Sequence, residues 1–260
     1  MLCTFRAPLR SIRRSIVAIL LLCGAMLLAV PASAQDPLQR YPQNYKLIFD
    51  NPQISVLRVH YGPHETVGVH DHSDLPTLFV YLNDSGRVRF RIEDIPPSAL
   101  VRPPAKLGSF RYSPGRRERH SVENLSNASS DFLRIELKQF PLRGGEAFRQ
   151  DPPASTAASR TAKEFSNDQV EVERIICATG ATCPLDAANE PSLLIALSQV
   201  SLNGIPYHDA GLNIGDIRWI EANQQATATA PAGEPAQFLR VRVKPTKPAS
   251  PISRMQAHIR

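Results

Sequence analysis

The chain has 260 residues, of which 42% are apolar and 21% charged, and its formal net charge is +6. This composition excludes collagen-like, disordered and multi-pass membrane proteins and leaves a globular chain of one or two domains. Four arginines lie within the first fourteen residues, and without residues 1–34 the net charge falls to +2. A nearly neutral mature chain gives no reason to expect nucleic acid or a membrane surface as a partner.

Residues 1–34 have the three parts of a secretory signal. The basic start is followed by an apolar run over residues 15–30, and Ala32-Ser-Ala34 supplies a small-residue cleavage site. A retained membrane anchor is the alternative, but this run is short for a hydrocarbon core of about 30 Å. We expect cleavage after Ala34 and a periplasmic or secreted protein that is not held in a membrane.

Short strands follow one another through the rest of the chain. Each is rich in β-branched or aromatic residues and is bounded by Gly, Pro, Asn or Asp, which predicts an all-β fold. The predicted strands span residues 54–61, 78–82, 87–92, 132–137, 193–197 and 238–243. In residues 87–92 three arginines alternate with apolar residues. We interpret them as a solvated face of a sheet, with recognition of an anion as the alternative.

Two segments depart from this pattern. Residues 141–166 lack apolar periodicity and are rich in Pro, Ala, Ser and Thr, so we interpret them as a linker or as a segment that wraps the surface. Residues 245–260 have the composition of a flexible tail. The predicted domains are therefore residues 35–140 and 167–244.

The two predicted domains resemble each other. Three blocks recur in the same order, with shifts of 116, 107 and 106 residues. The blocks are residues 51–59 with 167–175, 108–112 with 215–219, and 132–138 with 238–244. This order indicates a duplicated β-domain, each copy large enough for one sandwich or barrel. Trp219 matches Tyr112 in the repeat and is expected in a core.

Three histidines have the spacing of a metal site. His70 and His72 form an H-x-H, and residues i and i+2 of a strand point to one face, so both imidazoles can reach one ion. His120 is the third. The remaining histidines fit no such spacing, and they are His60, His64, His208 and His258.

These residues resemble the two motifs of the cupins, a family of double-stranded β-helix (jelly-roll) barrels. The residues that fit the first motif are Gly62, His70, His72 and Gly86, and those that fit the second are Gly108, Pro114, His120 and Asn124. Together with the internal repeat, the resemblance implies a bicupin with two tandem jelly-roll barrels. Metal-binding cupins add a glutamate to the histidines, but Pro76 and Thr77 stand at that place here.

The resemblance implies that His70, His72 and His120 hold a divalent transition metal (Fe, Mn, Zn, Ni or Cu). A three-histidine site is chemically sound because neutral imidazoles suit such ions and open positions remain for water or substrate. A small organic ligand would bind there, as in a metal-dependent oxygenase or isomerase. Candidate carboxylate ligands are Asp74 and Glu65, and candidate catalytic helpers are Glu65, Glu118 and Arg116.

A second class of function stays open, namely a non-catalytic ligand-binding or scaffold protein without metal, in which the histidines are vestigial. The second copy has Asp186, Ala188 and Ala226 at the positions of the three histidines. We therefore expect no metal in the C-terminal barrel. Exposed sheet edges favour a homodimer, although no residue specifies one.

Cys177 and Cys183 are the only cysteines left after signal cleavage. An oxidising compartment favours a disulfide between them. A redox-active pair is the alternative, but the spacing is not C-x-x-C. In the repeat the two cysteines flank the turn between two strands, so we expect the disulfide to close a hairpin.

Overall fold

The structure is a computed structural model that describes residues 36–93, 96–138, 146–153, 158–204 and 211–245. The predicted signal, the predicted tail beyond Pro245 and part of the predicted linker lie outside the described residues. Within the described ranges, no helix has the length and apolar character needed to cross a membrane.

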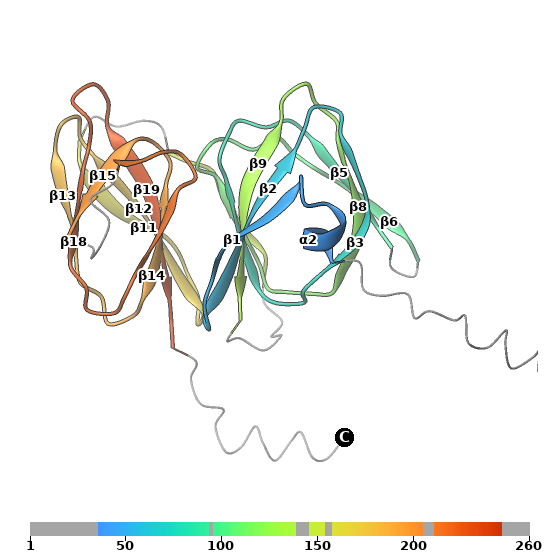
Figure 1. The fold of residues 1–260 in the computed structure, drawn as a ribbon, viewed down its shortest axis with the longest axis horizontal. Helices are drawn as coiled ribbons and strands as arrows, with labels where there is room; N and C mark the ends of the chain where they lie inside the picture. Colours follow the sequence, from blue (N-terminus) through green and yellow to red (C-terminus); the bar gives the residue numbers. More distant parts are fainter. Residues whose placement is uncertain (1–35, 94–95, 139–145, 154–157, 205–210, 246–260) are drawn as a thin grey trace, which may run out of the picture. The chain divides into compact units, whose positions relative to one another are not determined.

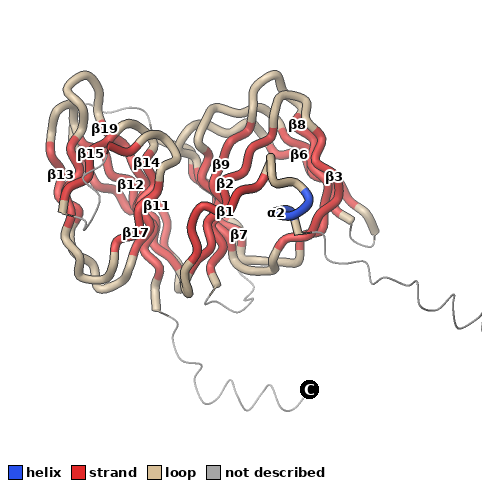
Figure 2. The backbone as a smooth tube through the Cα atoms, in the orientation of Figure 1, coloured by secondary structure: helices blue, strands red, loops and turns tan. Residues whose placement is uncertain are grey.

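Strands make up most of the described chain, as Figure 2 shows, and this confirms the predicted all-β fold. The six predicted strands all form, each with ends within two residues of the prediction. A four-residue helix, α2 (Pro37–Arg40), precedes them. Asp36 caps this helix by accepting a hydrogen bond from the backbone N–H of Leu38.

The first barrel consists of two antiparallel sheets, drawn blue to green in Figure 1. Its larger sheet has the strand order β1-β2-β9-β4-β7-β10 and its smaller sheet the order β3-β8-β5-β6. The strands are β1 (Tyr45–Asp50), β2 (Ile54–Tyr61), β3 (Thr66–His72), β4 (Thr77–Tyr81), β5 (Val88–Ile92), β6 (Ser98–Arg102), β7 (Phe110–Ser113), β8 (Glu118–Asn124), β9 (Ser130–Leu137) and β10 (Phe148–Gln150).

The second barrel repeats this plan in yellow to red (Figure 1), with the strand orders β11-β12-β19-β14-β17 and β13-β18-β15-β16. Its strands are β11 (Arg160–Ser166), β12 (Val170–Cys177), β13 (Thr182–Leu185), β14 (Ser192–Ala196), β15 (Val200–Asn203), β16 (Gly211–Leu212), β17 (Ile217–Ile220), β18 (Ala226–Thr229) and β19 (Ala236–Val243). Two tandem jelly-roll barrels are therefore present, as predicted.

The segment 141–166 departs from its interpretation as a linker, because its described parts contain strands. β10 pairs with β7 of the first barrel, and β11 pairs with β12 of the second. The second barrel consequently begins at Arg160, ahead of the predicted boundary at Asn167. Short polar edge strands are hard to detect in a sequence because they carry little of the alternation that marks a half-buried strand.

Equivalent strands of the two barrels pair in the same register, which supports the internal duplication. Val56 lies opposite Ile135 in the first barrel, and Val172, 116 positions after Val56, lies opposite Val241 in the second. Leu78 likewise pairs with Tyr112, and Leu193 pairs with Trp219.

The larger sheets of the two barrels contribute to one apolar core. Side chains alternate along each strand, so that Ile54 and Val56 of β2 belong to this shared core while Leu57 and Val59 belong to the interior of the first barrel. The same shared core contains Val170 and other residues of the second barrel. Trp219 packs against it and stacks on Phe49 of β1, as expected of a core residue.

Candidate metal centre

The three predicted metal ligands lie on two neighbouring strands of the smaller sheet in the first barrel. β3 carries His70 and His72, and β8 carries His120. The antiparallel register places His70 directly opposite His120 and His72 opposite Glu118. Cross-strand neighbours stand about 5 Å apart at their Cβ atoms, so strand pairing brings residues fifty positions apart into one cluster.

A β-bulge precedes the H-x-H. Between the pairs Val67–Val122 and His70–His120, β3 has two residues and β8 has one. One of the two is Gly68, where an added Cβ would collide with the hydroxyl of Tyr41. Glycine at this position therefore allows Tyr41, which follows α2, to pack edge-on against the His70 ring at 5.6 Å between ring centroids.

The imidazole nitrogens of the cluster converge. The Nε2 atoms of His70 and His72 are 3.1 Å apart, and one nitrogen from each histidine lies within 4.8 Å of the others. His70 Nδ1 donates to the carbonyl of Gly68 at 2.8 Å, because a carbonyl oxygen can only accept, and the lone pair of the neutral ring therefore lies on Nε2. His120 Nε2 is buried and has no hydrogen-bond partner among the described residues.

All three imidazoles are held neutral. Burial lowers the pKa of His70, and it lowers the pKa of His72 more strongly, with Arg134 acting in the same direction on both. Burial, together with the neighbouring His70, lowers the pKa of His120 to about 3. Neutral imidazole is the form that binds a metal ion. Three neutral rings and a buried nitrogen without a partner therefore fit a transition metal.

Two tyrosine hydroxyls reach the same place from the larger sheet. The hydroxyl of Tyr45 lies 2.8 Å from His70 Nε2 and 2.7 Å from the hydroxyl of Tyr61. Both tyrosines are 2% exposed. Burial raises the pKa of Tyr45 well above its ordinary value and that of Tyr61 to about 12, so both are neutral phenols without a metal. Motif spacing cannot reveal them, because tyrosines on strands also pack as ordinary core residues.

A buried ion pair stands beside the histidines. Arg134 of β9, 3% exposed, donates to Glu118 at 3.0 Å and to Glu136 at 2.9 Å. Burial alone would raise the pKa of Glu118, but the Arg134 guanidinium outweighs it and lowers that pKa to about 2. Glu118 is therefore an ionised carboxylate two residues before His120 on the same strand face.

Further positive charge surrounds the ring of Phe79. The guanidinium carbons of Arg102, Arg111 and Arg134 lie 5.6, 4.0 and 5.4 Å from the centre of that ring. Within the described part of the chain, Arg102 has no carboxylate partner. Two buried nitrogens of Arg111 have no hydrogen-bond partner among the residues that the structure describes, and burial, with Arg102 nearby, lowers its pKa to about 9. Against these three guanidinium groups stand the carboxylates of Glu118 and Glu136, both paired with Arg134, so positive charge is in excess by one.

A cavity of about 10 Å³ lies within this set, close to the space that one water molecule requires. Its lining residues are Tyr45, Tyr61, His72, Phe79, Phe90, Arg102, Glu118, His120, Phe132 and Arg134. Of the predicted helpers, Glu118 is therefore present in the site. Arg116 lies 3.9 Å from Glu118 and is mostly exposed.

The candidate carboxylate ligands named from the sequence do not join the cluster. Glu65 accepts hydrogen bonds from the backbone N–H of Gly62 and from Asn44, so it closes the turn before β3. Asp74 is exposed. Among the described residues, the histidines alone form the group of converging ligand atoms, and neither Asp74 nor Glu65 joins them.

The remaining motif residues have structural roles. Asn124 is buried, and its side chain donates to the carbonyls of Gly62 and Ala128. His60 bonds to Asp131, and His64 contacts Asn127 at the surface. His208 and His258 lie outside the described residues. Arg89 and Arg91 pair with Glu123, as expected for a solvated sheet face.

The interior of the second barrel is apolar at the corresponding place. Ala226 lies opposite Leu185, so Leu185, and not Asp186 as the repeat suggested, takes the position of His70. The one-residue difference reflects the bulge of β3. Both Leu185 and Ala226 belong to a buried apolar cluster, whereas Asp186 is exposed.

Cys177 and Cys183 form the predicted disulfide, with their Cα atoms 5.8 Å apart. They do not close a hairpin, however, because β12 belongs to the larger sheet of the second barrel and β13 to the smaller one. The disulfide instead joins the two sheets at the corner where the chain passes between them.

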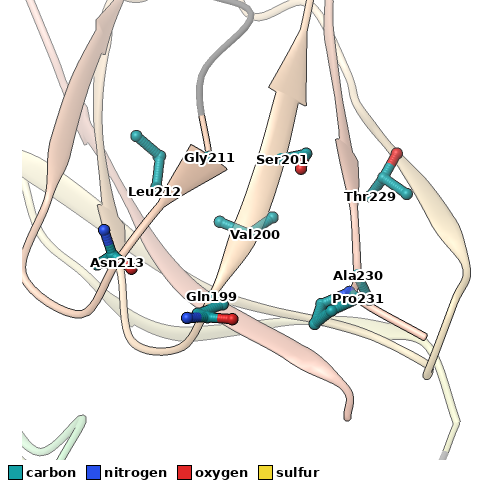
Figure 3. Close-up of a pocket in the computed structure, with 9 residues that line it drawn as sticks. All are labelled: Gln199, Val200, Ser201, Gly211, Leu212, Asn213, Thr229, Ala230 and Pro231. Carbon is teal, nitrogen blue, oxygen red and sulfur yellow. The ribbon is translucent and has the colours of Figure 1, made fainter. Parts of the chain in front are cut away.

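A larger hollow of about 300 Å³ lies on the second barrel beside β15, β16 and the end of β18. Figure 3 shows side chains such as Gln199, Asn213 and Thr229 around it. None of its lining residues is a histidine, cysteine or charged residue. It therefore lacks the chemistry of the first barrel.

No protein-family model matches the chain, and no curated protein matches it. Solved structures match it at low identity. The protein YhaK from Escherichia coli has a TM-score of 0.54 at 14% identity, over 78% of this chain and 92% of that one. Bacillus subtilis oxalate decarboxylase, which has Mn(II) centres, has a TM-score of 0.51 at 12% identity, over 85% and 78%. Lactobacillus farciminis oxalate decarboxylase, solved as a formate complex, has a TM-score of 0.52 at 11% identity, over 80% and 85%.

These neighbours are cupin-fold proteins, and at such identities they establish the fold alone. The tandem barrels and the matched registers of the repeat agree with them. The chain therefore has the cupin fold in its two-barrel form, that of a bicupin.

Proposed function

We propose that the first barrel binds a divalent transition metal through His70, His72 and His120 and presents a small carboxylate ligand to it. The observation that carries this proposal is the convergence of three neutral, largely buried imidazoles, with His120 Nε2 left without a partner in the described part of the chain. We further propose that the chain is exported, which rests on the signal-like residues 1–34.

Imidazole donors suit Zn, Fe, Ni, Cu and, with oxygen ligands added, Mn. When bound, the metal would supply a Lewis acid that polarises an oxygen of the ligand. A solved structure of similar fold that has Mn(II) centres, at 12% identity, supports the choice of a divalent ion.

The charges of the site favour an anionic ligand. Arg102 has a guanidinium at the cavity without a carboxylate partner, and guanidinium groups bind carboxylates in a bidentate manner. Arg111 adds buried donors that lack partners. The cavity has about the space of one water molecule, so only a very compact molecule could enter, and its walls would have to move for a carboxylate. One neighbouring oxalate decarboxylase was solved with formate.

The protein groups around the ligand have distinct tasks. Arg134 is fixed by its ion pairs with Glu118 and Glu136 and would attract the negative group of the ligand toward the histidines. Glu118 is held ionised near neutral pH, so it positions Arg134 and does not donate a proton. The rings of Phe79, Phe90 and Phe132 wall the cavity and exclude water, which strengthens each charge interaction.

Elemental analysis of the protein purified without a histidine tag tests the metal. We expect close to one equivalent of a transition metal, which is lost in the His70→Ala/His72→Ala variant and retained in a matched His60→Ala/His64→Ala control. Oxygen uptake and isomerisation of small carboxylates would then be screened with that metal. Background metal in all three proteins, also after incubation with Mn, Fe, Ni, Cu and Zn, would contradict the proposal and favour a metal-free binding or scaffold role.

The exported form is tested separately by N-terminal sequencing of the protein recovered outside the cytoplasm. We expect Gln35 as the first residue. A chain that starts at Met1 and stays with the membrane would contradict export by a cleaved signal.

A further inference from the structure

The three-histidine cluster lacks a carboxylate at the place where metal-binding cupins carry one. Pro76 is buried there, and the hydroxyl of Thr77 is engaged with the carbonyl of Leu75. Glu118 is committed to Arg134, and its oxygens do not belong to the group of converging ligand atoms. A fourth protein ligand would therefore have to come from another element.

Tyr45 is the residue whose oxygen lies among the ligand nitrogens. It is the first residue of β1, in the larger sheet, and its ring contacts the rings of both His70 and His72, with centroids 5.1 and 5.5 Å apart. Its hydroxyl oxygen is 2.8 Å from His70 Nε2, and that nitrogen is 3.1 Å from His72 Nε2.

These separations are those of neighbouring ligands on one ion. Metal–nitrogen and metal–oxygen bonds of about 2.0–2.2 Å at right angles place adjacent donor atoms about 2.8–3.1 Å apart. The Tyr45 oxygen and His72 Nε2 thus each lie at coordination spacing from His70 Nε2. His120 Nε2 supplies the donor whose partner is missing.

The hydrogen bonds of Tyr45 are compatible with this role. Without a metal, its hydroxyl lies 2.8 Å from His70 Nε2 and 2.7 Å from the Tyr61 hydroxyl, and either hydroxyl of the tyrosine pair can donate to the other. A metal on His70 would take the Nε2 lone pair and remove that partner from the Tyr45 hydroxyl, which is 2% exposed. Buried polar groups rarely remain unsatisfied, and coordination of the ion by the Tyr45 oxygen, with Tyr61 as donor to it, would satisfy both hydroxyls.

We propose that the oxygen of Tyr45 is the fourth protein ligand of the metal, in the place of the absent glutamate. The inference rests on the proposed metal site. The bond formed is metal–oxygen, the bond broken is the Tyr45 O–H, and the proton leaves to solvent as the metal enters. The Tyr61 hydroxyl, 2.7 Å away, then donates to the resulting phenolate and positions it.

Cu(II) is the probe, because a phenolate bound to Cu(II) gives a charge-transfer band in the visible range that imidazole ligands do not give. We expect the wild-type protein with one equivalent of Cu(II) to show this band. Tyr45→Phe should abolish the band, keep one equivalent of Cu(II) and lower the affinity at least tenfold. The matched control Tyr61→Phe, which removes a hydroxyl 2.7 Å away, should keep the band and shift it.

Resonance Raman spectroscopy of the wild-type complex provides a second test that does not depend on a variant folding, since excitation in the band enhances the ring and C–O modes of a bound phenolate. One equivalent of bound Cu(II) without these modes, or with a band of unchanged intensity in Tyr45→Phe, would overturn the assignment of Tyr45 alone. Failure to bind Cu(II), the divalent ion for which nitrogen sites have the highest affinity, would overturn the metal site and the Tyr45 ligand together.

Discussion

The buried ion pair between Arg134 and Glu118 gives the sharpest stability prediction. Arg134→Met keeps most of the apolar stem and leaves Glu118, whose side chain is 8% exposed, without its main cation. Arg116, 3.9 Å away and 57% exposed, compensates only weakly. Removing one partner of a buried pair costs about 3–5 kcal/mol. The lowering of the Glu118 pKa from 4.5 to about 2 corresponds independently to about 3 kcal/mol.

The second barrel offers a matched control. Arg240 lies 106 positions after Arg134, is 2% exposed, and donates to the Ser192 hydroxyl and to the carbonyl of Asp186. No carboxylate pairs with it in the described residues, so Arg240→Met leaves no buried charge behind. We expect this change to cost only about 1–2 kcal/mol, from the lost hydrogen bonds.

The pH dependence separates charge from packing. In the wild type, the lowered pKa of Glu118 stabilises the fold above about pH 4.5, and this contribution is lost as the pH falls toward 2. In Arg134→Met, burial raises the pKa of Glu118, so protonation relieves the cost as the pH falls from about 7 to 5. The difference between the two proteins therefore shrinks on acidification.

The assay is urea unfolding followed by the fluorescence of Trp219, which packs against the shared core. The free energy of unfolding is compared at about pH 7 and 5, with the slope m checked for constancy. Equal losses in Arg134→Met and Arg240→Met, with no dependence on pH, would refute the electrostatic reasoning and leave packing as the cause.

Three further results are expected. The pKa of His120 is lowered to about 3 from an ordinary value near 6.5, so the melting temperature should fall as the pH drops below about 6.5. His120→Gln should make the melting temperature depend less on pH. A stronger dependence on pH in the variant would refute this. Replacing Cys177 and Cys183 by alanine should lower the free energy of unfolding by about 2 kcal/mol, given their separation of six residues, measured by urea titration against the oxidised wild type. Gly68→Ala should displace Tyr41 and weaken metal affinity at least tenfold by calorimetric titration, whereas Gly233→Ala, where an added Cβ meets nothing, should not.

Much of the fold could be predicted from the sequence because its signals are local. β2 is a continuous run of mostly buried residues, and its ends coincide with the predicted 54–61. The repeat predicted the second barrel because strand registers are conserved between the copies. β10 and β11 were missed because edge strands bury few side chains, and the corner position of the disulfide was missed because sheet membership depends on pairing across the whole chain.

The site, too, could be predicted only in part. The H-x-H and His120 could be found because residues i and i+2 of a strand point to one face and because the motif spacing singles out His120. Tyr45 and Arg134 could not, because each comes from the opposite sheet and reaches the histidines only through closure of the barrel. The bulge at Gly68 could not be anticipated either, and it moved the repeat register by one residue at the place where the two barrels are compared.

The shared core has a consequence for how the two barrels depend on each other. Ile54, Leu133, Val170 and Val241 are all fully buried in one cluster, so a chain cut between the barrels would expose an apolar sheet face on each product. Duplication here has not produced two independent modules. Any ligand that binds the folded first barrel alone would raise the unfolding free energy of both, and the second barrel, although it has lost the histidines, would share in that stabilisation.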